Sequence, residues 1–112
     1  MKAFSLLAVA LFLAIFANPV LAETSVEVLQ AAEAEYPRTA LRRGLTGEVL
    51  VEYSVNEQGR AEDIRVLNSG SRVFESAAIK AVRDSIYMPV KRDGNRVKVS
   101  GVQRRFVFAL PQ

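Results

Sequence analysis

The chain has 112 residues, no histidine and no cysteine, and its net charge at neutral pH is only +3. Without cysteine, thiol catalysis, thiolate metal sites and disulfide bonds are excluded. The small positive excess is interleaved with acidic residues instead of clustered, so the sequence lacks the electrostatic pattern of a nucleic-acid-binding protein.

The N-terminal residues have the pattern of a secretory signal. An apolar stretch from Phe4 to Ala17 is followed by Pro19 and by a small-residue end at Ala22. This pattern predicts that residues 1–22 are removed during export. An uncleaved membrane anchor over Ala3 to Ala22 is the alternative, because about 20 apolar residues can span a bilayer.

The remaining residues, 23–112, contain no repeat and no proline-rich linker, which indicates one domain. A capping-box pattern that starts at Thr24 predicts a first helix from Ser25 to about Glu35. A short second helix is predicted to begin at Pro37. It should end at Gly44, since glycine readily adopts the left-handed conformation of a helix end.

Residues 48–55 alternate between apolar and polar side chains, which predicts a half-buried strand. A turn over residues 56–59 then leads to a return strand over about 60–67. The expected core positions of these two strands and of the later elements are Val51, Tyr53, Ile64, Ala78, Val82 and Phe106.

An amphipathic helix is predicted from the apolar spacing between Phe74 and Ile86, with Ser71 as its cap. Met88-Pro89 should mark its exit, because the residue before proline disfavours the helical conformation. After a turn at Asp93-Gly94 comes a last long strand.

The last strand is predicted from Val97 to Leu110. Its apolar residues change from odd to even numbers along the strand, so a bulge at Ser100-Gly101 is expected to restore the register. The fold class is therefore α+β, with helices on one face of a three-stranded antiparallel sheet. A right-handed crossover gives the strand order 2-1-3 and leaves the third strand at an edge, where it can accept an extended peptide.

The same residues carry a resemblance to a known family. The pattern consists of Tyr36-Pro37, Gly44, Gly47, Val49, Val51, Val55, Gly59, Ser69-Gly70, Phe74, Ala77-Ala78, Ala81-Val82, Pro89, Gly94, Phe106 and Phe108. In order and spacing, over Tyr36 to Leu110, it resembles the TonB C-terminal domain family. The resemblance implies a periplasmic energy transducer whose third strand pairs with a short peptide, the TonB box, of outer-membrane siderophore and vitamin transporters.

Full-length transducers of that family carry a histidine-bearing transmembrane helix and a proline-rich spacer. The present sequence has no histidine and no such spacer. Two functions are therefore considered: a transport module that pairs with a transporter peptide or a related envelope protein, and a structural or interaction protein of the cell envelope without energy coupling, possibly associated with peptidoglycan. Pairing of edge strands could also form a homodimer.

The expected partner-binding residues are Tyr36, Pro37, Val102, Gln103, Arg104, Arg105, Phe106, Val107 and Phe108. Tyr36-Pro37 could instead be a helix entry with a packed ring, and Arg104-Arg105 could be a solvated pair that protects the edge from aggregation. An enzyme is not expected, since Ser76 and Lys80 lie on an exposed helix face where nothing would desolvate the lysine. No cofactor, metal or small-molecule substrate is expected.

Overall fold

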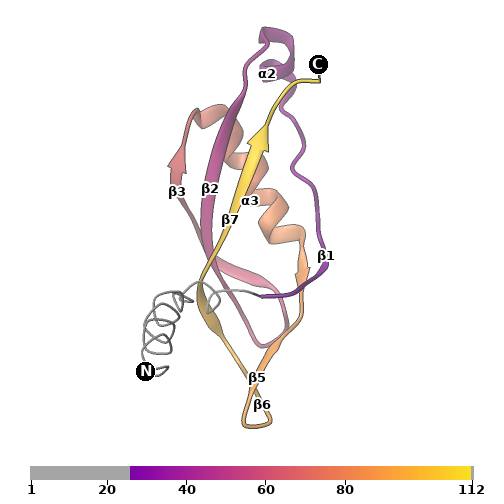
Figure 1. Ribbon diagram of the computed structural model, residues 1–112, viewed down its shortest axis with the longest axis vertical. Coiled ribbons are helices and arrows are strands. Elements are labelled where there is room, and N and C mark those ends of the chain that lie inside the picture. Colours follow the sequence, from indigo (N-terminus) through magenta and orange to yellow (C-terminus); the bar gives the residue numbers. More distant parts are fainter. Residues whose placement is uncertain (1–25, 112) are drawn as a thin grey trace, which may run out of the picture.

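A three-stranded antiparallel sheet in the order β3-β2-β7 forms the centre of the structure, which is a computed structural model describing residues 26–111 (Figure 1). β2 spans Gly47–Val55, β3 spans Ala61–Ser69 and β7 spans Val99–Phe108. The predicted sheet and its order, with the first strand in the middle, are therefore confirmed. The predicted cleavage point at Ala22 lies outside the described residues.

The helix α3, Glu75–Asp84, lies across one face of this sheet and continues from the 3-10 turn η2, Arg72–Phe74 (Figure 1). Small side chains on α3 let the helix approach the sheet closely. Of the six predicted core residues, five are buried and Ile64 is half-buried at the margin of the core. The buried five are Val51, Tyr53, Ala78, Val82 and Phe106.

The predicted helix from Ser25 to Glu35 is wrong. Residues Val28–Gln30 instead form a short strand, β1, which pairs antiparallel with β4, Ile86–Tyr87. The amide of Met88 also donates to the carbonyl of Glu27, at 2.9 Å. Helix propensity in this weakly amphipathic segment is overridden by pairing with residues almost sixty positions away.

The predicted extent of the helix between Phe74 and Ile86 is also wrong. α3 ends at Asp84, and Ile86 belongs to β4. Ser85 has an extended backbone, and its buried hydroxyl donates to the carbonyl of Ala81 at 2.7 Å. The same oxygen accepts the amide of Ala32 at 2.9 Å. Ser85 therefore ends the helix and holds the N-terminal extended segment against it.

The short helix α2, Arg38–Arg43, confirms the prediction, with Pro37 before it and Gly44 after it at a φ of 66°. No helix within residues 26–111 is long and apolar enough to cross a membrane. The expected turn at Asp93-Gly94 connects two short strands, β5, Val90–Arg92, and β6, Asn95–Val97.

The predicted last strand is divided, since Val97 belongs to β6 and β7 begins at Val99. The bulge lies at Ser100-Gly101, as predicted from the change between odd-numbered and even-numbered apolar residues. Tyr53 of β2 lies opposite Val102, whereas Val55 lies opposite Val99, so Ser100 and Gly101 together face one residue of β2. Gly101 has a φ of 75°, a conformation that glycine adopts without strain.

The first testable prediction concerns the core. Val82 is fully buried between α3 and the sheet, and Val82→Asp would place an unpaired charge there at a cost of several kcal/mol. A domain of this size has only about 5–10 kcal/mol of stability. Circular dichroism should show a largely unfolded protein, whereas Arg83→Gln at the exposed neighbouring position should melt like the parent. Parent-like melting of Val82→Asp would mean that α3 does not pack on the sheet.

A second prediction follows from the hydroxyl of Ser85. Ser85→Ala leaves the half-buried amide of Ala32 without its acceptor, which should lower the free energy of unfolding by about 1 kcal/mol. Hydrogen exchange should become faster at Ala32 while the amides of β2 stay protected. An unchanged exchange rate at Ala32 would contradict the role assigned to Ser85.

Candidate functional site

The candidate site is the outer edge of β7. Within residues 26–111, β7 pairs with β2 on one side and with no strand on the other. The edge runs along the length of the sheet and is not closed by a further strand (Figure 1). A strand edge of this kind presents backbone donors and acceptors to a partner chain.

The register of the sheet determines which backbone groups point outward. The carbonyl of Glu48 accepts the amide of Gly70, so the backbone of Glu48 faces β3. Because the direction of the backbone groups alternates along a strand, Val49, Val51 and Tyr53 face β7. Their partners on β7 are Phe106, Arg104 and Val102, which therefore use their amides and carbonyls within the sheet.

The backbone amides and carbonyls of Gln103, Arg105 and Val107 consequently point away from β2. These three residues are exposed, and Val107 has 62% of its surface accessible. Among the expected binding residues, they are the ones that combine an outward backbone with an accessible side chain.

The other expected residues of β7 face the core. Val102, Phe106 and Phe108 are buried, with 4–7% of their surface accessible. Their side chains help to position β7. They face the core and cannot contact a partner on the solvent face of the sheet. The expected binding group Val102 to Phe108 is therefore split by the alternation of the strand into an inner and an outer set.

Arg104 and Arg105 are adjacent in sequence, but their guanidinium groups contact different parts of the fold. The guanidinium of Arg104 donates to Ser85 Oγ at 3.2 Å and to the carbonyl of Ala32 at 3.4 Å, and it lies 4.5 Å from the centre of the Phe106 ring. Arg104 therefore ties the N-terminal segment to β7. Arg105 lies on the solvent face, where its guanidinium pairs with Glu48 at 2.9 Å.

Tyr36 is a packed residue at the end of the sheet. Its ring makes edge-to-face contacts with Phe74 and Phe108, each with ring centres 5.6 Å apart, and its hydroxyl donates to the carbonyl of Leu45. Pro37 precedes the first turn of α2. The structure thus favours the packed-ring interpretation of Tyr36-Pro37, and it brings Tyr36 next to the end of β7 through Phe108.

Ion pairs cover the solvent face of the sheet. Arg65 of β3 pairs with Glu52 of β2 at 2.5 Å, beside the pair of Arg105 and Glu48. The hydrogen bond from Arg65 holds the pKa of Glu52 below its usual range. On the opposite face, burial raises the pKa of the Tyr53 phenol above its usual range.

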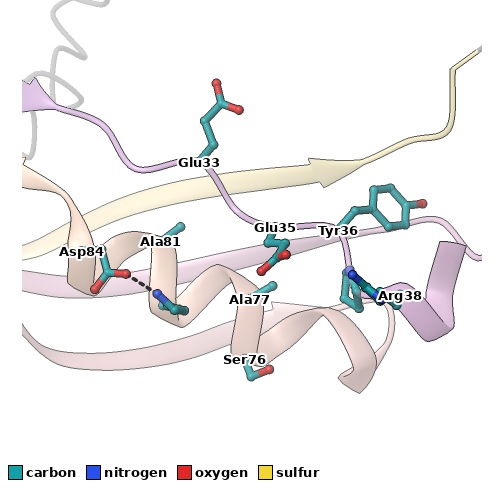
Figure 2. Close-up of a pocket in the computed structure, with 10 residues that line it drawn as sticks. Glu33, Glu35, Tyr36, Arg38, Ser76, Ala77, Ala81 and Asp84 are labelled. Carbon is teal, nitrogen blue, oxygen red and sulfur yellow. Dashed lines mark hydrogen bonds and ion pairs between the residues drawn. The ribbon is translucent and has the colours of Figure 1, made fainter.

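A groove of about 480 Å³ lies between α3 and the extended segment before α2 (Figure 2). Sequence reasoning missed it, because the segment that forms one wall was predicted to be helical. The side chain of Glu35 points from the extended segment toward α3 (Figure 2). On α3, Lys80 pairs with Asp84 at 2.6 Å. The hydrogen bond from Lys80 holds the pKa of the Asp84 carboxyl below its usual range. Within residues 26–111, no group of three or more acidic side chains is placed to hold a metal ion.

Comparisons with known proteins agree with this architecture. The family model described as the Gram-negative bacterial TonB protein C-terminal matches residues 32–110. The chain is 31% identical over 69 residues to protein TonB of Helicobacter pylori, covering 61% of this chain and 25% of that protein. It is 41% identical over 59 residues to protein tonB2 of Pseudomonas aeruginosa, covering 52% of this chain and 22% of that protein.

The fold is similar to that of a solved structure, the solution NMR structure of the Pseudomonas aeruginosa TonB CTD. The TM-score is 0.68 at 29% identity, covering 82% of this chain and 93% of that one. The chain spans about a quarter of the length of these two curated relatives. The family match covers most of the chain, including β7 and α3, and the chain therefore belongs to the TonB C-terminal domain family.

Proposed function

We propose that this protein is a non-enzymatic binding module of the periplasm, and that the edge of β7 captures an extended peptide of an outer-membrane transporter or of a related envelope protein. In this mode the peptide adds a strand to the sheet. Backbone hydrogen bonds supply much of the affinity, and side-chain contacts supply the choice of partner.

The observation that carries the proposal is the outward direction of the backbone at Gln103, Arg105 and Val107. These alternate positions offer amides and carbonyls along about five residues of strand, which matches the length of a short peptide segment. Their side chains are exposed on the solvent face, where they would lie beside alternate side chains of an added strand.

The extended segment between β1 and α2 passes close to β7 (Figure 1). Within the described residues, it is joined to β7 through the side chain of Arg104, which reaches the carbonyl of Ala32. No backbone hydrogen bond between the segment and β7 is found there. Within residues 26–111, this lack of backbone bonding supports the proposal that the outward groups of the edge bind a partner.

The second candidate function is that of an envelope interaction protein without energy coupling, possibly associated with peptidoglycan. Both functions would use the same edge. Binding of a transporter peptide distinguishes them, since the second function predicts capture of a different envelope component.

The third testable prediction uses proline at the edge. Gln103→Pro and Arg105→Pro each remove an outward amide, and the proline ring would also hold a peptide away from the strand. One hydrogen bond contributes about 1 kcal/mol, or about five-fold in affinity, and the steric effect of the ring adds to this. Each variant should therefore bind a transporter's periplasmic peptide at least about five-fold more weakly. Calorimetric titration measures this, and both variants should remain folded because an edge strand tolerates proline.

Three comparisons make the test specific. Gln103→Ala and Arg105→Ala keep the backbone donor and should bind within about three-fold of the parent. Arg104→Pro removes an amide that faces Val51, so it should instead lower the stability of the fold by about 1–3 kcal/mol. Sedimentation of the parent would reveal a homodimer that occupies the same edge. Folded proline variants that bind as tightly as the parent would show that the edge is not the binding site.

A further inference from the structure

The β5–β6 hairpin projects from one end of the molecule, beyond the sheet and α3 (Figure 1). Within residues 26–111, its two strands pair with each other and with no other strand. All residues from Lys91 to Arg96 are exposed. The core therefore does not account for the composition of this tip.

Two cations lie directly opposite each other on the hairpin. Lys91 of β5 pairs in register with Arg96 of β6, so their side chains point to the same face. Like charges in this position destabilise a hairpin, and a two-stranded hairpin is only marginally stable in water. The pair therefore weakens the element that contains it.

No ion pair within the described residues relieves this repulsion. Lys98, just after the hairpin, shows the contrast, because its ammonium group binds Glu62 at 2.8 Å and Asp63 at 2.9 Å. Lys91, Arg92 and Arg96 have no such acidic partner among residues 26–111. Among residues 26–111, three cations at the projecting tip thus have no ion-pair partner.

The cations surround the tip. Arg92 lies opposite Asn95, on the face away from Lys91 and Arg96, and Asp93 in the turn is the one carboxylate within residues 91–96. A convex tip with positive charge on both faces cannot enclose a small anion or a peptide. It can meet an extended negative surface end-on, where attraction needs no pocket and acts over about 10 Å.

We propose that the β5–β6 tip binds the anionic lipid surface of an envelope membrane. Juxtamembrane lysines and arginines are attracted to anionic headgroups independently of detailed geometry, and the effects of several cations add. Such contact would keep the edge of β7 close to a membrane from which a partner peptide emerges. Lipid binding by the tip is a function separate from peptide capture. The tip can bind a membrane whether or not β7 captures a peptide.

The fourth testable prediction is sedimentation of the purified full chain with lipid vesicles. The parent should bind vesicles that contain phosphatidylglycerol more tightly than vesicles of phosphatidylcholine alone, and the difference should shrink as salt is raised to about 0.15 M or above. The triple variant Lys91→Gln, Arg92→Gln, Arg96→Gln should lose about ten-fold or more of the affinity for the anionic vesicles.

The matched control removes the same charge at another site. Arg38, Arg42 and Arg43 of α2 are also exposed, and the last two suit the negative end of the helix dipole. Changing all three to glutamine should leave vesicle binding within about three-fold of the parent. Because parent and variants share the same N-terminal residues, any lipid affinity of the apolar stretch from Phe4 to Ala17 cancels in the comparison.

Several results would overturn the proposal. Equal losses in both triple variants would mean that net charge, and not the tip, governs binding. Parent-like binding by the hairpin variant, or equal binding of the parent to both kinds of vesicle, would exclude the tip as an anionic-lipid site. Hairpin-dependent binding to isolated peptidoglycan but not to vesicles would assign the tip to a different anion. Peptide titration of the hairpin variant keeps the two proposals separate, because it should match the parent whatever happens with lipid.

Discussion

The sheet takes its register from the backbone of β2, and the rest of the structure depends on that strand. One set of its backbone groups faces β3 and Gly70, the residue directly after β3, and the alternate set faces β7. The side chains of Val49, Val51, Tyr53 and Val55 fill the core beneath α3. Since β2 can neither rotate nor slip without exposing these residues, the direction of every amide on β7 is fixed as well.

The second constraint is the polar junction around Ser85. A serine hydroxyl at the end of α3 joins the helix to Ala32, and Arg104 reaches the same two residues from β7. The extended segment around Ala32 is held there by a few hydrogen bonds, and none of residues 31–35 is fully buried. Segments held in this way open more readily than a packed core. The extended segment beside the candidate edge is therefore expected to be less protected than the sheet itself.

Much of the fold could be predicted because its signals are local. The alternation in β2, the glycine that ends α2 and the apolar spacing of α3 each depend on neighbouring residues. The change of parity in the last strand was enough to locate the bulge at Ser100-Gly101. The strand order then followed from the handedness of the crossover.

The wrong predictions depend on contacts between distant residues. Residues 28–30 form a strand because β4 offers them a partner, and no local pattern reveals that pairing. Ile86 has helical spacing from the residues of α3, but the extended backbone at Ser85 separates it from the helix. For the site, the edge was predictable from topology, whereas the different positions of Arg104 and Arg105 required the register and the bulge. The groove beside α3 was missed for the same reason as β1.

Amide hydrogen exchange along β7, measured with and without a transporter's periplasmic peptide, tests the central claim most directly. In the protein alone, Arg104 and Phe106 should be protected because their amides bond to β2, while Gln103, Arg105 and Val107 should exchange quickly. Adding the peptide should slow exchange at these three alternate amides and leave the inner ones unchanged. Peptide binding without new protection at Gln103, Arg105 and Val107 would contradict strand addition at this edge.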